Sequence, residues 1–255
     1  MRIRPAAAAG SFYPADPNEL AATVDRLLDA VPMVAGPRPA ALIVPHAGYR
    51  YSGPIAASGY AVLRRAAADL RRVLLLGPAH FVPLSGMAQS DADAWVTPLG
   101  EVPVERASGL TGSAEAHARE HALEVQLPFL QRALPDAVAM PLAVGTSQPE
   151  EVADEIARLA SSDTLIVVST DLSHYQDADT ARRLDRRTAD AIVRADPAAI
   201  QPADDCGASP LRGLLAWCAR HAYQITELDL RTSADTAGSR LRVVGYGAFR
   251  CDRRS

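Results

Sequence analysis

Three of the six histidines in this chain stand just after short apolar runs, where buried strands would end. His46 follows the first such run, His80 follows the second, and Asp171 and His174 follow the third. Ligands in open α/β sheets bind beyond the carboxyl ends of the strands, so we expect these four side chains to meet at one edge of a sheet. A single histidine in such a position is more often structural, but three at equivalent positions favour a site for metal binding or proton transfer.

Two histidines and one anionic ligand leave open positions on a metal ion, as in many non-haem iron, copper and zinc sites. The third ligand is either Asp171 or a cysteine. Cys206 lies in a polar loop before a predicted helix with Ser209 as its N-cap, where the helix N-terminus would stabilise a thiolate. Cys218 fits the buried face of that helix, and Cys251 lies near the end of the last predicted strand. The residue pattern alone leaves the third ligand open.

A second histidine pattern offers an alternative chemistry. His117, Glu120 and His121 match H-x-x-E-H, the inverted zinc-protease pattern, and the spacing would put both histidines on one helical face. The pattern fixes only three positions, Pro128 interrupts the helix that follows, and no third ligand stands at a suitable spacing. We therefore expect an ordinary polar helix face with an exposed His117, rather than a protease site.

Short apolar runs alternate with longer amphipathic segments along the whole chain. This alternation predicts an α/β fold with a mostly parallel central sheet flanked by helices, in a single domain over residues 1–255. Strands are expected at 40–44, 73–76, 138–144, 164–168, 224–230 and 241–249, with the last two antiparallel, and a hairpin is expected within 88–104. Helices are expected at 54–70, 115–134, 149–160, 180–194 and 210–222.

Composition excludes several classes of function. The chain has 255 residues and a net charge of −4, and all 26 of its basic residues are arginine, so no general nucleic-acid or membrane-surface footprint is expected. Three cysteines are too few for a disulfide framework, which together with the absence of a membrane span or a signal-like apolar run favours a cytoplasmic protein. Glycine-rich nucleotide fingerprints and the GxSxG elbow are missing, so no nucleotide cofactor is expected.

Several segments together resemble the Memo family, whose prokaryotic branch is called AmmeMemoRadiSam system protein B. They are the opening Arg4-Pro5-Ala6 through Pro14, PHAGY at 45–49, LGPAH at 76–80, the Thr97–Gly100 turn, EHALEVQLPFLQ at 120–131 and Asp171-x-Ser173-His174-Tyr175. These matches run in order over nearly the whole chain. The family is similar in fold to class III extradiol dioxygenases, which are non-haem iron enzymes.

The resemblance implies a metal site made by His46, His80 and Cys206, binding one iron or copper ion. It also implies that Asp171 and His174 carry catalysis. The substrate-binding wall would contain His121, Glu124, Tyr49 and Phe12.

Two functions follow from the resemblance. The first is redox or dioxygenase-like chemistry on a small molecule. The second is a non-catalytic module that binds a peptide or protein in the same cleft. The family name further suggests functional association with a radical-SAM protein and an Amme-type domain protein.

Overall fold

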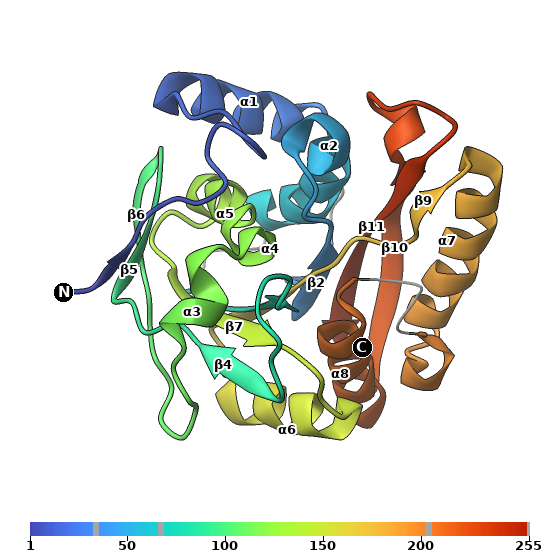
Figure 1. Ribbon diagram of the computed structural model, residues 1–255. Helices are drawn as coiled ribbons and strands as arrows, with labels where there is room; N and C mark the ends of the chain where they lie inside the picture. The colour runs from blue at the N-terminus through green and yellow to red at the C-terminus, as the bar shows by residue number, and fades with distance from the viewer. Residues whose placement is uncertain (33–35, 66–68, 202–205, 254–255) are drawn as a thin grey trace.

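The computed structural model describes residues 1–32, 36–65, 69–201 and 206–253 and shows a central sheet between two layers of helices (Figure 1). The strand order of this sheet is β10–β11–β2–β8–β3–β7–β4, and β9 pairs with β11. Its strands are β2 (Ala41–Val44), β3 (Arg72–Pro78), β4 (Met87–Gln89), β7 (Val138–Val144), β8 (Thr164–Ser169), β9 (His174–Gln176), β10 (Tyr223–Thr232) and β11 (Val243–Arg253). A smaller sheet joins β1 (Ile3–Arg4), β5 (Ala94–Thr97) and β6 (Gly100–Pro103).

The predicted α/β fold is confirmed, and the central sheet is mixed. Strands β2, β8, β3 and β7 are mutually parallel, whereas β4, β11 and β10 run antiparallel to their neighbours. The final pair β10–β11 is antiparallel, as expected, and β5 and β6 form the expected hairpin. The parallel strands form the middle of the sheet because both of their faces are apolar and need cover on each side.

Successive residues of a strand point to opposite faces, and this alternation divides the core in two. In β2, Leu42 and Val44 join one buried cluster, while Ala41 and Ile43 join the other. The first cluster is completed by α1 (Pro17–Asp29), α2 (Tyr49–Tyr60), α4 (His121–Glu124) and α5 (Leu127–Ala133). The second is completed by α6 (Pro149–Leu159), α7 (Ala178–Val193) and α8 (Ala208–Arg220). The remaining helical elements are α3 (Ala114–Ala118), η1 (Ala61–Arg65), η2 (Pro197–Ala199) and η3 (Ser233–Asp235).

Two helix predictions differ from the structure. The helix expected from Pro54 begins instead at Tyr49, whose N–H donates to the carbonyl of Phe12 and whose hydroxyl donates to the carbonyl of Val125. These tertiary bonds fix the first turn, and Pro54 lies inside the helix. The helix ends at Tyr60 and continues as η1, and residues 66–68 of the predicted span lie outside the described residues.

The helix expected at 115–134, with a kink or split at Pro128, is three short helices, α3, α4 and α5. The chain breaks at Glu120, whose carboxylate accepts the N–H of Ala122 and so acts as the N-cap of α4. Pro128 lies in the first turn of α5, where its missing N–H costs nothing. One helix was not expected at all: α1 begins at Pro17, with Asp16 as its N-cap.

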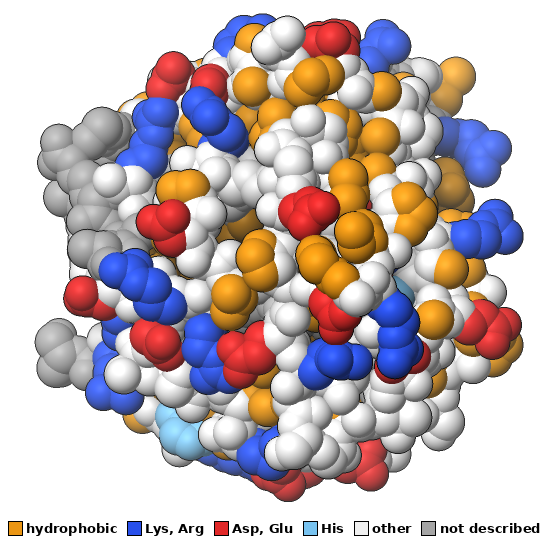
Figure 2. All heavy atoms as spheres, turned by 90° about the vertical axis from the view of Figure 1, so that its left-hand side faces the viewer, with side chains coloured by type: hydrophobic (Ala, Val, Ile, Leu, Met, Phe, Trp, Pro, Cys, Tyr) orange, Lys and Arg blue, Asp and Glu red, His pale blue; other side chains and the backbone are white. Residues whose placement is uncertain are grey.

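Figure 2 shows the face that lies on the left in Figure 1, where arginine and acidic side chains lie interspersed among apolar ones. This mixture agrees with the small net charge of −4. Over the described part of the chain, every helix is too short or too polar to cross a lipid bilayer.

Candidate metal centre

The carboxyl ends of β2, β3 and β8 lie side by side at one edge of the sheet. Val44 pairs with Ser169, and Leu76 pairs with Val168, so the three strands end at nearly the same level. His46 follows β2 by two residues, His80 follows β3 by two, and Asp171 follows β8 by two. The sheet edge therefore collects the side chains that the sequence placed after its buried strands.

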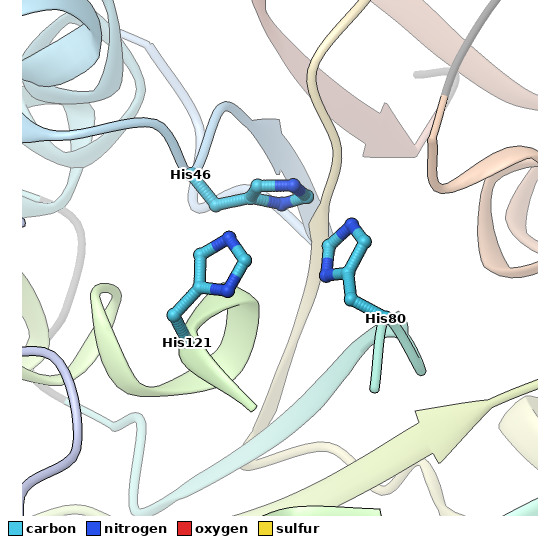
Figure 3. A group of neighbouring side chains, drawn as sticks. All are labelled: His46, His80 and His121. Carbon is cyan, nitrogen blue, oxygen red and sulfur yellow. The ribbon is translucent and has the colours of Figure 1, made fainter. Parts of the chain in front are cut away.

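Three histidines converge at this edge: His46, His80 and His121. Each offers a ring nitrogen that lies within 4.8 Å of the others'. The ring centroids of His46 and His80 are 5.2 Å apart and those of His80 and His121 are 4.8 Å apart, and Figure 3 shows the three rings turned toward one another. This spacing lets the three side chains surround a single ion.

The tautomer of His46 is set by Ser169. The Ser169 hydroxyl has one hydrogen, which it donates to the carbonyl of Ala122 at 2.7 Å, and it accepts the side-chain amide of Gln126 at 2.9 Å. Nδ1 of His46 lies 3.0 Å from the same oxygen and must therefore donate to it. Nε2 of His46 keeps its lone pair, which is the form that binds a metal ion.

Cys206 lies directly against that lone pair. Its Sγ is 3.1 Å from Nε2 of His46 and 3.8 Å from the carbonyl oxygen of Asp171. Gly207 fixes the position of Cys206 by packing closely against Thr170. Its N–H donates to Oγ1 of Thr170, and a Cβ at this position would come within 2.5 Å of that atom. Gly207 is also the N-cap of α8, so the helix begins two residues before the position expected from Ser209.

His80 is held by Glu120, which is fully buried. One carboxylate oxygen accepts the backbone N–H of His80 at 2.7 Å, and the other lies 2.9 Å from Nδ1. Burial raises the pKa of Glu120, but the hydrogen bonds and charge of His80 and the N–H of Ala122 outweigh it and lower the pKa to about 2. The ionised carboxylate accepts a hydrogen bond from Nδ1–H of His80, which leaves Nε2 as a ligand atom.

We expect Glu120→Gln to weaken metal binding by roughly 10–100-fold. The glutamine would turn an NH₂ group toward N–H donors of His80 and Ala122, so the ring of His80 would lose its fixed orientation. Metal affinity measured by competition with a chelator checks this. Glu115→Gln, which changes an exposed carboxylate on the neighbouring α3, is the control and should bind like the parent protein. Equal affinity in both variants would contradict the positioning role.

His121 completes the cluster from the first turn of α4. Its Nδ1 is buried and has no hydrogen-bond partner among the described residues. Phe12 covers the ring with a centroid distance of 4.3 Å, and Phe81 approaches its edge at 5.9 Å. Burial lowers the pKa of His121 to about 4, and that of His46 to about 3, so both rings are neutral at pH 7. Nδ1 of His121 lies 3.7 Å from Oε1 of Glu120. A neutral imidazole beside two others suits a metal ion.

Asp171 and His174 flank the cluster. Oδ1 of Asp171 accepts the N–H of His46 at 2.8 Å and that of Ala47 at 3.3 Å. Burial raises the pKa of Asp171, while these bonds and the nearby His174 act in the opposite direction. His174 opens β9, and the next residue, Tyr175, has a left-handed backbone with φ of 61°. Left-handed backbone conformations of non-glycine residues are strained, and they are found more often at active sites and ligand-binding segments.

Two residues expected to bind substrate, Glu124 and Tyr49, have contacts within the fold. The carboxylate of Glu124 is fully buried and accepts from Arg4 at 2.5 Å, Tyr13 at 2.5 Å and the N–H groups of Ala7 and Ala8. It thus anchors the N-terminal segment. The hydroxyl of Tyr49 donates to a backbone carbonyl and its ring packs in the first core cluster. The carboxylate of Glu124 and the ring of Tyr49 are thus engaged in contacts within the fold. Phe12 lies against His121 of the histidine cluster.

The expectation of an exposed His117 is wrong. His117 is buried, its Nε2 lies 3.0 Å from the carbonyl of Ala88, and its ring packs against the edge of Trp95. Burial lowers its pKa to about 4. Because the chain breaks at Glu120, His117 and His121 lie on different helices and do not share a face. The H-x-x-E-H pattern is therefore divided between a core residue, an N-cap and a residue of the histidine cluster.

Comparison with known proteins agrees with the sequence resemblance. A family model described as "Memo-like protein" matches residues 4–250. A MEMO1 family protein of Methanopyrus kandleri is 33% identical over 96% of this chain and 98% of its own length. Similar proteins of Methanosarcina barkeri and Aquifex aeolicus are each 35% identical, over 97% and 96% of this chain and 99% and 98% of theirs. An uncharacterized Escherichia coli K12 protein of solved structure aligns with 84% of this chain and 99% of its own at 13% identity and a TM-score of 0.49. From the family-model match and the near full-length relatives, the chain belongs to the Memo-like family.

Proposed function

We propose that this protein binds one iron or copper ion at the sheet edge and uses it for redox or oxygen-dependent chemistry on a small molecule in the cytoplasm. The observation that carries the proposal is the pair of locked tautomers at His46 and His80. Ser169 and Glu120 each accept a hydrogen bond from one Nδ1–H group, so that both Nε2 lone pairs are kept for a ligand role. A redox-active ion held there would supply the capacity to exchange electrons with substrate or oxygen.

The donor set fits such an ion. Imidazole suits iron, copper and zinc, and a thiolate shifts the preference further from magnesium, calcium or manganese. His46 and His80 are common to both candidate ligand sets. The third ligand is Cys206 in the set implied by the family resemblance, and His121 in the set with the closest ring nitrogens. We propose Cys206 as the third ligand, because its Sγ lies 3.1 Å from the available Nε2 of His46.

Replacing Cys206 by serine should remove most of the metal and, with Co²⁺ as a probe, abolish the thiolate-to-metal absorption band. His121→Ala should keep that band, because a wall residue does not supply the sulfur ligand. Affinity in the parent should rise with pH, since a thiol must lose its proton to bind. Cys218→Ser is the control for a buried thiol and should cost only stability. Full affinity and unchanged spectra in Cys206→Ser would contradict the assignment.

The space beside the ion suits a small molecule. A cavity of about 310 Å³ adjoins Cys206, and its lining includes Ala79, Leu84 and Val144 together with polar groups such as Thr146 and Ser209. On the other side, Phe12 and Phe81 cover His121 and limit the access of water. Asp171 and His174 would hold and move a proton between the bound molecule and solvent.

We expect Asp171→Asn to lower the rate of oxygen consumption by the metal-loaded protein, with ascorbate as electron donor, by roughly 10²–10⁴-fold. The amide oxygen can still accept from the N–H of His46, so metal content should stay unchanged. An unchanged rate would contradict a proton-transfer role for Asp171. Loss of metal would instead make Asp171 a residue that orients His46.

A non-catalytic binding module is the second candidate, and the exposed aromatic rings near the cleft favour it. Phe81 follows His80 directly and is 45% exposed, and Tyr175 follows His174 directly and is 64% exposed. Guanidinium groups of Arg119 and Arg242 lie over these rings at 4.7 and 5.0 Å. Such rings could dock a peptide or a partner, including the radical-SAM and Amme-type proteins suggested by the family name. Tight partner binding by protein that takes up no redox metal would favour this function.

A further inference from the structure

A second cavity lies at the opposite edge of the sheet from the metal centre. Its volume is about 590 Å³, and it opens where β2 and β8 begin, beside the C-terminal ends of α6 and α8. Ala40 and Thr164 from these strand starts line it, together with Tyr223 from β10 and Arg253 from β11. The cavity is therefore separate from the site described above.

The charged side chains that line this cavity are all positive. Arg38 and Arg253 line it, and none of its lining residues is acidic. Within the described part of the chain neither arginine forms an ion pair, in contrast to Arg220 on the nearby α8, which is paired with Asp154. Arg253 donates through Nε to the hydroxyl of Tyr223 at 3.3 Å, which leaves its two terminal nitrogens for another partner. Asp163 interacts electrostatically with Arg38, but its carboxylate accepts the hydroxyl of Ser161 and it does not line the cavity.

The indole N–H of Trp217 adds an independent observation. Trp217 lines the cavity and is only 5% exposed as a residue, and its indole N–H, which is not fully enclosed, has no hydrogen-bond partner among the described residues. Buried tryptophans normally pair this group, as Trp95 does with Ser90 at 2.9 Å. The ring of Tyr223 stacks on Trp217 at 4.5 Å, which fixes the orientation of the indole.

We propose that this cavity binds a flat organic anion, an aromatic carboxylate in its simplest form. The guanidinium groups of Arg38 and Arg253 would receive the carboxylate through charge-assisted hydrogen bonds. The indole N–H of Trp217 supplies a further donor. The rest of the wall combines polar side chains with apolar ones, of which Pro37, Pro39, Ala157, Ala160 and Ile166 are available to cover a ring. Pockets with an apolar lining and a few convergent polar groups are typical of small-molecule sites.

Nuclear magnetic resonance tests this directly, because the chain has only two tryptophans and hence two indole N–H signals. Titration of the full-length protein with 2-naphthoate should shift the Trp217 signal and leave the Trp95 signal in place, with Trp217→Phe providing the assignment. The neutral analogue 2-naphthol should bind at least about tenfold more weakly, equivalent to about 1.4 kcal/mol. Inorganic phosphate, which lacks the ring, should also bind more weakly than 2-naphthoate.

Variants separate the proposed contacts from general charge effects. Arg253→Gln should weaken 2-naphthoate binding by about tenfold, whereas Arg220→Gln removes the same charge outside the cavity and should have little effect. His46→Ala should bind 2-naphthoate like the parent, because the two sites lie at opposite edges of the sheet. An unmoved Trp217 signal, equal binding of 2-naphthol, tighter binding of phosphate or an unaffected Arg253→Gln variant would each overturn the proposal.

Discussion

Replacing His46 by alanine is expected to lower the affinity for iron(II) or copper by more than about a hundredfold. Loss of a residue that merely orients a ligand already costs roughly 10–100-fold, and His46 is placed to be a ligand itself. Its ring is buried, its Nδ1–H donates to Ser169, and its Nε2 faces both Cys206 and the other rings. Isothermal titration with the metal ion under anaerobic conditions measures the change.

His221→Ala is the matched control, because His221 is an exposed histidine at the end of α8, remote from the cluster. Its affinity should equal that of the parent protein. A circular dichroism spectrum separates metal loss from unfolding in the His46→Ala variant. Unchanged affinity in a folded His46→Ala variant would remove the basis for a metal centre at this sheet edge.

The low pKa values of His46 and His121 predict how this affinity responds to acid. Burial lowers them to about 3 and 4, so protons compete with the metal for these nitrogens only well below neutral pH. The contribution of these two rings to metal affinity should therefore be constant between pH 8 and pH 6. Any rise of affinity with pH in that window must come from another ligand, and it should be absent in Cys206→Ser if the thiol is that ligand.

The largest expected effect on stability belongs to Glu124→Gln, which should lower the free energy of unfolding by about 3–5 kcal/mol. The change removes the only carboxylate that Arg4 contacts among the described residues and leaves the buried guanidinium without a counter-charge. It also replaces one of two acceptor oxygens, which together serve Tyr13 and two backbone N–H groups of the N-terminal segment. Urea-induced unfolding followed by circular dichroism gives the free energy.

Asp25→Asn is the control for this change, because the ion pair of Asp25 with Arg132 is more than two-fifths exposed on both sides. Exposed pairs are worth at most about 1 kcal/mol, so the control should stay within that range. A cost for Glu124→Gln no larger than for Asp25→Asn would show that the Glu124 network does not hold the N-terminal segment in place.

The grouping of residues at the carboxyl ends of β2, β3 and β8 could be predicted from the sequence, because it depends only on the direction of these strands. Strands that are apolar on both faces are parallel and central, so the residues two positions beyond β2, β3 and β8 had to emerge at one edge. This reasoning brought His46, His80 and Asp171 together without any knowledge of packing. It could not choose a third ligand, because the position of Cys206 beside His46 depends on the close approach of the next residue, Gly207, to Thr170.

The roles of residues 117–124 could not be predicted, because periodicity suggested one helix where tertiary contacts make two. Glu120 accepts the N–H of His80 and is the N-cap of α4, so the helical path is interrupted at this residue. As a result His117 lies in the core, whereas His121 lies in the histidine cluster. Glu124 was likewise expected to be a polar residue of the substrate site. Its carboxylate accepts four hydrogen bonds, from Arg4, Tyr13 and two backbone N–H groups, and these contacts could not be predicted from the sequence. One missed helix did have a local signal, since Asp16 and Pro17 form a typical N-cap and first turn for α1.

Elemental analysis of anaerobically purified protein tests the central claim most directly, with a His46→Ala/His80→Ala double variant purified in parallel. We predict about one iron or copper ion per chain in the parent and almost none in the double variant. The two proteins differ only at His46 and His80, so a difference in metal content must come from these two residues. Equal metal content in the two proteins, or a parent that contains no redox metal and takes up none when it is supplied, would contradict a metal centre built on His46 and His80.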